Sequence, residues 1–135
     1  METEKVCVNL SGAELGALDV LVAQGLFTSR SDVIRAGIRE VSERHAIALE
    51  RVTKHATCIG VMALNKRYLE EVVRQGKRLR IVVVGIFRLA DDVSPDLADE
   101  AIERAQVLGS VRAPQAVLDR LGDRIARNLD GAGLL

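Results

Sequence analysis

The segment Gly25–Arg35, GLFTSRSDVIR, places a glycine, three hydroxyl groups and charged side chains around the start of an expected helix. Ser29 is a typical N-cap residue, and Asp32 three positions later makes the S-x-x-D variant of a capping box. The first N–H groups of a helix have no partner within the helix, and together they bind phosphate well. The segment therefore predicts a capped helix start whose chemistry also suits a phosphate group.

Composition narrows the classes of protein to which this chain can belong. The 135 residues are 48% hydrophobic, which is compatible with a packed core, and no apolar run approaches the length of a membrane span. The first residues lack the charged start and apolar core of a signal peptide, so we expect a cytoplasmic protein without a membrane partner. Cys7 and Cys58 lie in dissimilar settings, which argues against a disulfide scaffold and a structural zinc site.

The charged residues are unevenly distributed although the formal net charge is zero. Basic and acidic residues number five and eight in residues 1–50, nine and two in residues 51–90, and five and nine in residues 91–135. A net charge of zero at first argues against a nucleic-acid partner, because such domains are commonly basic, but the zero conceals a basic block between two acidic ones. The basic middle block fits either a solvated face of a helix and a strand or a binding role.

Residues 5–10 alternate between apolar and other side chains, which predicts a strand with one buried face. One face carries Val6, Val8 and Leu10, and the other carries Lys5, Cys7 and Asn9. A lone strand leaves its backbone groups unpaired, and no hairpin partner lies nearby in the sequence. Its partner is therefore either the distant C-terminal half or the same strand of a second chain.

Two helices are expected after this strand. A helical stripe of leucine and valine runs from Ser11 and stops at Gly25, and a second apolar face begins after Ser29 and continues to about residue 53. The strand, the L-x-x-L-D-x-L-V first helix, the turn and the second helix together resemble a ribbon-helix-helix DNA-binding domain of the Arc, MetJ and CopG type. The resemblance covers about residues 4–45 and rests on the order and spacing of all these elements.

The resemblance implies an intertwined homodimer in which two N-terminal strands pair antiparallel and enter the major groove of a palindromic operator on double-stranded DNA. By position, the residues that would face the bases are Lys5, Cys7 and Asn9. Those that would contact phosphate are Thr28, Ser29, Arg30 and Ser31. For Arg30 the alternative is an ion pair with an acidic residue of its own or the partner chain.

Cys7 departs from the polar or basic residue that the family places in the middle of the strand. We interpret it as a small residue at a weakly recognised base step. The alternative is a disulfide to its own copy across the ribbon, which would make DNA binding sensitive to oxidation. Disulfides are rare in the cytosol, which favours the first interpretation.

Residues 51–135 predict a small α/β region after the N-terminal domain of residues 1–50, so that the fold class is α+β. The expected elements are a strand within 55–64, a helix within 66–78, a strand at 79–89, a helix from Ser94–Pro95 to Gly109, and a helix starting near Pro114. The strand-helix-strand order resembles the nickel-responsive regulators, whose C-terminal domain binds metal and forms tetramers. Only His55 and Cys58 offer ligands here, so we expect no metal or other cofactor.

No catalytic arrangement is visible in the sequence. The phosphate-binding, nucleophile-elbow and dinucleotide motifs are absent, and the acidic residues between Asp91 and Glu100 are explained by a helix start. We therefore expect a DNA-binding transcriptional regulator, a repressor, whose C-terminal region serves assembly into a tetramer or the sensing of an effector. The alternatives are an antitoxin that binds a toxin, a plasmid partition protein, and an assembly scaffold that does not bind DNA.

Overall fold

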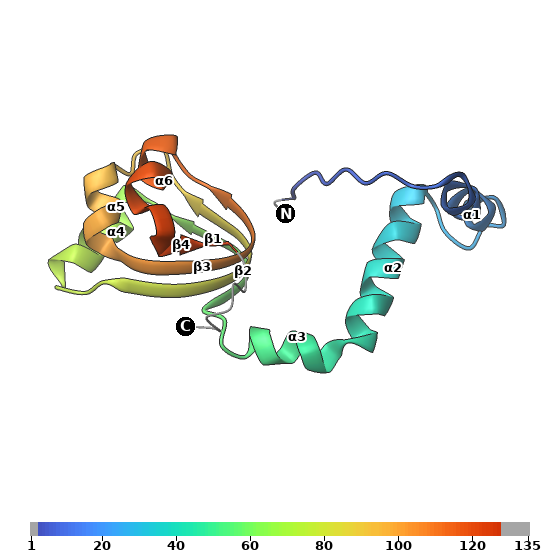
Figure 1. Ribbon diagram of the computed structural model, residues 1–135, viewed down its shortest axis with the longest axis horizontal. Helices are drawn as coiled ribbons and strands as arrows, with labels where there is room; N and C mark the ends of the chain where they lie inside the picture. Colours follow the sequence, from blue (N-terminus) through green and yellow to red (C-terminus); the bar gives the residue numbers. More distant parts are fainter. Residues whose placement is uncertain (1–2, 128–135) are drawn as a thin grey trace. The chain divides into compact units, whose positions relative to one another are not determined.

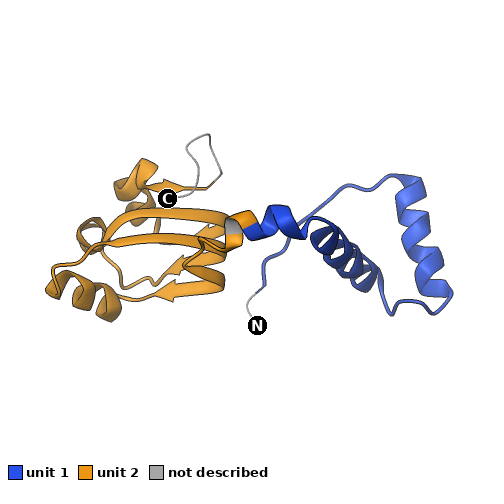
Figure 2. Cartoon of the chain, turned by 90° about the horizontal axis from the view of Figure 1, so that it is seen from below, with its two compact units in different colours: residues 1–50 blue, residues 51–135 orange. Residues whose placement is uncertain are grey.

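The computed structural model describes residues 3–127, without the side chain of Val52. The chain divides into two compact units, residues 1–50 and residues 51–135 (Figure 2).

Unit 1 contains an extended N-terminal segment followed by helices. Helix α1 (Gly12–Ala23) begins with a full capping box, in which the Ser11 hydroxyl accepts from the Glu14 N–H at 3.2 Å and the Glu14 carboxylate accepts from the Ser11 N–H at 3.0 Å. Helix α2 (Arg30–Arg44) follows the turn at Gly25, and α3 (Ala46–Thr53) continues across the unit boundary. The two predicted helices are confirmed, but the second does not run unbroken to about residue 53, because α2 ends at Arg44 and α3 follows after His45.

Neither α1 nor α2 contains a buried residue. Large apolar side chains of this unit instead remain exposed in the single chain, among them those of Val6, Val8, Ile34, Ile38 and Val41. Unit 1 therefore has secondary structure and caps but no hydrophobic core of its own.

Unit 2 is a parallel sheet with helices on one face. Its elements are β1 (Cys58–Leu64), α4 (Lys66–Arg74), β2 (Leu79–Leu89), α5 (Pro95–Ala101), β3 (Ile102–Arg112), α6 (Gln115–Leu121), the 3₁₀ turn η1 (Gly122–Arg124) and β4 (Ile125–Ala126). The strands lie in the order β1-β2-β3-β4, and each adjacent pair is parallel. Figure 1 shows α4, α5 and α6 gathered on the same side of this sheet.

The core of unit 2 lies between the sheet and these three helices. Helices contribute Leu69, Val72, Ala98, Ala101, Val117 and Leu121, and the strands contribute Ile81, Val83, Phe87, Leu89, Ile102, Ala105 and Val107. Successive strand residues point to opposite faces, so the residues between these core positions form the second face. One row of that face is Ile59, Val84 and Leu108, which are paired in register across β1, β2 and β3.

Three glycines form a ladder through the middle of the sheet. Gly60, Gly85 and Gly109 pair in register, and their φ angles are 118°, 138° and 138°. A Cβ atom on Gly85 would lie 1.9 Å from the Gly60 carbonyl oxygen, and one on Gly109 would lie 2.0 Å from the Gly85 oxygen. The spacing of about 25 residues marks unit 2 as a short array of similar strand-helix repeats.

The expected helix from Ser94–Pro95 to Gly109 is wrong beyond its first two turns. Helix α5 ends at Ala101, and residues 102–112 form β3 in parallel pairing with β2. The expected helix after Pro114 is also short, because η1 and β4 follow α6. After β2 the chain therefore forms a helix, a strand, a helix with a 3₁₀ turn and a short strand, rather than the two helices that the sequence predicted. Pairing with β2 and burial of Ile102, Ala105 and Val107 outweigh the local helical pattern.

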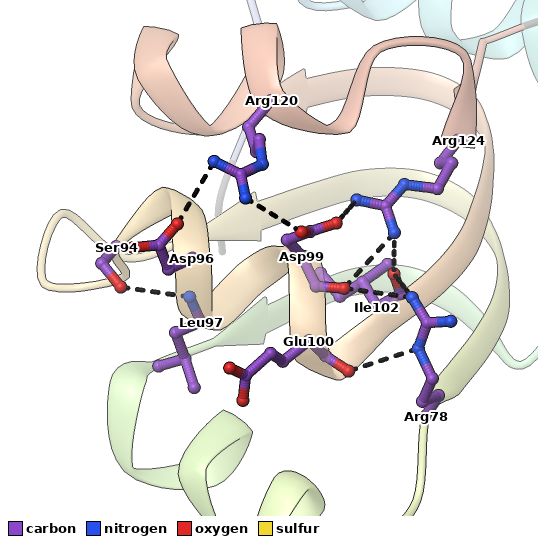
Figure 3. A network of polar contacts seen from close by, with 9 residues as sticks. All are labelled: Arg78, Ser94, Asp96, Leu97, Asp99, Glu100, Ile102, Arg120 and Arg124. Carbon is purple, nitrogen blue, oxygen red and sulfur yellow. Dashed lines mark hydrogen bonds and ion pairs between the residues drawn. The ribbon is translucent and has the colours of Figure 1, made fainter.

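A polar network around Asp99 ties α5 to α6 and to the start of β2 (Figure 3). The Asp99 carboxylate accepts from Arg124 and, at 3.1 Å, from Arg120. These hydrogen bonds, that from Arg124 first, lower the pKa of Asp99. Arg78 donates to the carbonyl oxygens of Asp99 at 3.1 Å and Glu100 at 3.3 Å, which satisfies the end of α5. The Asp99 carboxylate thus has a structural role, because it joins α5 to Arg120 of α6 and to Arg124.

Candidate nucleic-acid interface

The extended segment before α1 presents apolar side chains that nothing in unit 1 covers. Val6 and Val8 are 79% and 73% exposed. An open hollow of about 510 Å³ is lined by Val6, Cys7, Val8, Leu10, Ile34 and Ile38. The segment and the second helix together therefore form an apolar surface large enough to accept an element of another chain.

The sheet of unit 2 does not include residues 3–10, because among the described residues it consists of β1 to β4 alone. The sequence left two pairing partners open for residues 5–10, and the choice between them stays a prediction. In the single chain the segment of residues 5–10 forms no strand, which is expected where no second strand pairs with it. Lys5, Cys7 and Asn9 are all exposed along it, and their contact with bases stays a prediction.

The start of α2 has the predicted cap. The Ser29 hydroxyl accepts from the Asp32 N–H at 3.1 Å. The Asp32 carboxylate accepts from the N–H of Thr28 at 3.2 Å and from the Thr28 hydroxyl at 3.3 Å, one residue earlier than in a full capping box. The Thr28 side chain thus orders the turn, and its hydroxyl hydrogen is bound to a carboxylate.

Arg30 forms an ion pair within its own chain. Its Nε and Nη2 atoms donate to the two carboxylate oxygens of Asp19 at 2.7 and 2.8 Å, which joins α1 to the start of α2. The hydrogen bond from Arg30 lowers the pKa of Asp19. Both side chains are more than half exposed, at 56% and 53%, so the pair adds little stability and mainly orients the two helices.

The remaining donors at this helix start are backbone groups. Arg30 and Ser31 are the first two helical residues, and their N–H groups precede the first intrahelical hydrogen bonds. The exposed hydroxyl of Ser31 lies in the same turn. This arrangement can hold one phosphate oxygen, while the Arg30–Asp19 pair fixes the direction of the helix.

Other candidate sites are not formed. His55 is exposed and Cys58 half-buried, and residues 3–127 contain no group of three or more acidic, histidine or cysteine side chains able to hold a metal ion. Within the same range, no helix combines the length and the apolar character that crossing a membrane requires.

Residues 1–118 match the Ribbon-Helix-Helix transcriptional regulator family. The chain belongs to this family. The regulator is accordingly of a DNA-binding class that usually oligomerises. Its match continues past unit 1 through β3 into α6, so the family pattern includes most of unit 2. Comparisons with characterised proteins and with solved structures gave no match.

Proposed function

We propose that the regulator is a homodimeric repressor that inserts a ribbon of two antiparallel N-terminal strands into the major groove of a palindromic operator. The observation that carries the proposal is the absence of buried residues in α1 and α2, beside the exposed apolar face of residues 6–10. Such a unit folds stably only when a second copy covers that face.

The dimer would supply the missing core. When two copies of residues 5–10 pair, Val6, Val8 and Leu10 turn toward Ile34 and Ile38, which already line one hollow. Full burial of a valine, leucine or isoleucine side chain contributes about 1.5–3 kcal/mol. Ten such side chains in a dimer are enough to offset the ordering of both N-terminal segments.

The opposite face of the ribbon would read the operator. The major groove accepts a two-stranded ribbon and shows a distinct pattern of donors and acceptors for each base pair. Lys5 would donate to guanine O6 or N7, and Asn9 would form two hydrogen bonds with adenine. Cys7 would leave the central base step with a weak donor only.

The start of α2 would set the register of the ribbon on the DNA. The N–H groups of Arg30 and Ser31, with the Ser31 hydroxyl, would hold a backbone phosphate. Ser29 and Thr28 would keep the turn in place through their bonds with Asp32. Because a phosphate is the same at every base pair, these contacts would add affinity without sequence preference.

The proposal is tested by selecting bound duplexes from a random pool and measuring the affinity of variants for the selected site. Lys5→Ala and Asn9→Ala should each lose about 1–3 kcal/mol of binding free energy and relax the preference at one base position. Lys77→Ala, which removes an exposed charge from unit 2, is the matched control and should keep that preference. Undiminished affinity in both ribbon variants would show that the strand is not the reading element.

Unit 2 supports a regulator over an antitoxin. An antitoxin commonly wraps its toxin with a segment that folds on binding. Unit 2 is instead a folded unit in which sixteen apolar side chains between Leu64 and Leu121 are buried. We therefore assign unit 2 to assembly or effector sensing.

A further inference from the structure

Strand β1 forms an edge of the sheet in unit 2. It lies first in the strand order, and its outer side pairs with no strand among the described residues. It is seven residues long, CIGVMAL, and contains neither a charged residue nor a proline. The other edge of the sheet is the two-residue strand β4.

An edge strand of this composition is unprotected. An edge presents a row of free N–H and C=O groups, and natural proteins guard long edges with lysine, proline, short length or a covering element. In β1 the side chains of Ile59 and Val61 are also 65% and 41% exposed on the face that carries no helix. This edge therefore has both the backbone groups and the apolar side chains that a pairing strand would cover.

The glycine ladder indicates how a partner strand would align. Gly85 pairs with a glycine on each side, and a Cβ placed on it would collide with the backbone carbonyl group of Gly60. Gly60 has the same kind of φ, but a Cβ placed on it would meet nothing within 4 Å. The outer side of Gly60 thus has space for a further glycine at this level.

We propose that β1 pairs antiparallel with β1 of a second copy of this chain, about a two-fold axis that passes through Gly60. In this register Gly60 faces Gly60 of the second copy, and Ile59 faces Val61. Opposed β-branched side chains stabilise a strand pair, and the pairing covers the two exposed side chains of β1. The inference goes beyond the proposed function and does not require DNA.

A second copy is favoured over another protein by the chemistry of the strand. In an isologous contact the same patch of both copies meets, so a charged strand would bring like charges close together, and β1 carries none. The proposed ribbon dimer would carry two copies of unit 2, each with one such edge. Pairing of β1 between two ribbon dimers produces a tetramer.

The register is tested by disulfide formation in full-length chains that also carry Cys7→Ser and Cys58→Ser. Ile59→Cys chains are mixed with Val61→Cys chains, one of them bearing a mass tag. Opposed residues have Cα separations of roughly 4.5–5.5 Å, which a disulfide can span. The two copies of residue 59 would lie diagonally across the strand pair, about 7–8 Å apart, and so would the two copies of residue 61. This separation is too large for a disulfide.

The mixture should therefore form a covalent dimer of both chains roughly tenfold faster than either variant alone. A mixture of Ile59→Cys with Tyr68→Cys, which places an exposed thiol on α4, is the control and should stay at the slow rate. A mixture that reacts no faster than this control, or a Val61→Cys chain that reacts fastest with itself, would overturn the proposal.

Hydrogen exchange on the unmodified protein provides a second measurement. Pairing should protect every amide of residues 58–62, whereas an open edge leaves alternate amides to exchange at the rate of exposed groups. Alternating protection would contradict the pairing even if the variants failed to fold. Neither measurement involves DNA. Both therefore test the pairing of β1 even if the operator-binding test of the proposed function fails.

Discussion

The ladder of glycines predicts an unusual sensitivity to the smallest possible side chain. In Gly85→Ala the new Cβ would lie 1.9 Å from the carbonyl oxygen of Gly60 and 2.8 Å from its carbonyl carbon. Both atoms belong to the backbone of a paired strand, so no rotamer change relieves the collision. Strain at a φ of 138° costs about 1–3 kcal/mol and overpacking adds about 1–3 kcal/mol, which together predict a loss of about 4 kcal/mol in the free energy of unfolding.

The matched control is Gly76→Ala at the end of α4. Gly76 also has a positive φ, 67°, but an added Cβ meets nothing within 4 Å, so only strain of roughly 1–2 kcal/mol is expected. Urea unfolding can be followed through the fluorescence of Tyr68, the single tyrosine of a chain without tryptophan, which reports on unit 2 alone. Equal losses in the two variants would refute the steric argument.

Three further predictions concern the helix start, the acidic network and the ribbon. Ser31→Glu should weaken binding to specific and random duplexes nearly equally, because it sets a negative charge against the phosphate; a loss confined to the specific site would contradict this assignment. The lowered pKa of Asp99 means that its contribution to stability is present above the unfolded pKa near 4 and is lost as the pH falls through the folded value. Asp99→Asn should therefore reduce the difference in unfolding midpoint between pH 7 and pH 3, and an unchanged difference would exclude that role. Forced oxidation should give a covalent dimer in Cys58→Ser but not in Cys7→Ser, because Cys7 lies near the two-fold axis of the proposed ribbon; no dimer in Cys58→Ser would argue against that placement.

Local chemistry made the N-terminal half predictable. Ser11 and Ser29 cap their helices through bonds to residues three positions later, and such bonds depend only on nearby sequence. The ion pair of Arg30 with Asp19 was one of two alternatives, because its geometry depends on how α1 and α2 pack. The partner of residues 5–10 was also left open, since strand pairing is not local.

The C-terminal half was predictable only as far as its first two strands. Residues 79–89 are β-branched nearly throughout and form β2 as expected. Residues 102–112 mix charged, apolar and small side chains, so that local pattern did not separate a helix from a strand. The signal that identifies β3 is the recurrence of Gly60, Gly85 and Gly109 at nearly equal spacing. Taken together, the three glycines indicate equivalent positions in three strands, whereas Gly109 taken alone suggests the end of a helix.

The lack of a core in α1 and α2 makes the folding of unit 1, in the proposed dimer, a bimolecular reaction. Its apparent stability then depends on how much protein is present, and each tenfold dilution removes about 1.4 kcal/mol. Synthesis and dilution at cell division would thus change the fraction of folded DNA-binding units as well as operator occupancy. A regulator built in this way would respond to its own abundance more steeply than one whose DNA-binding unit is folded in every single chain.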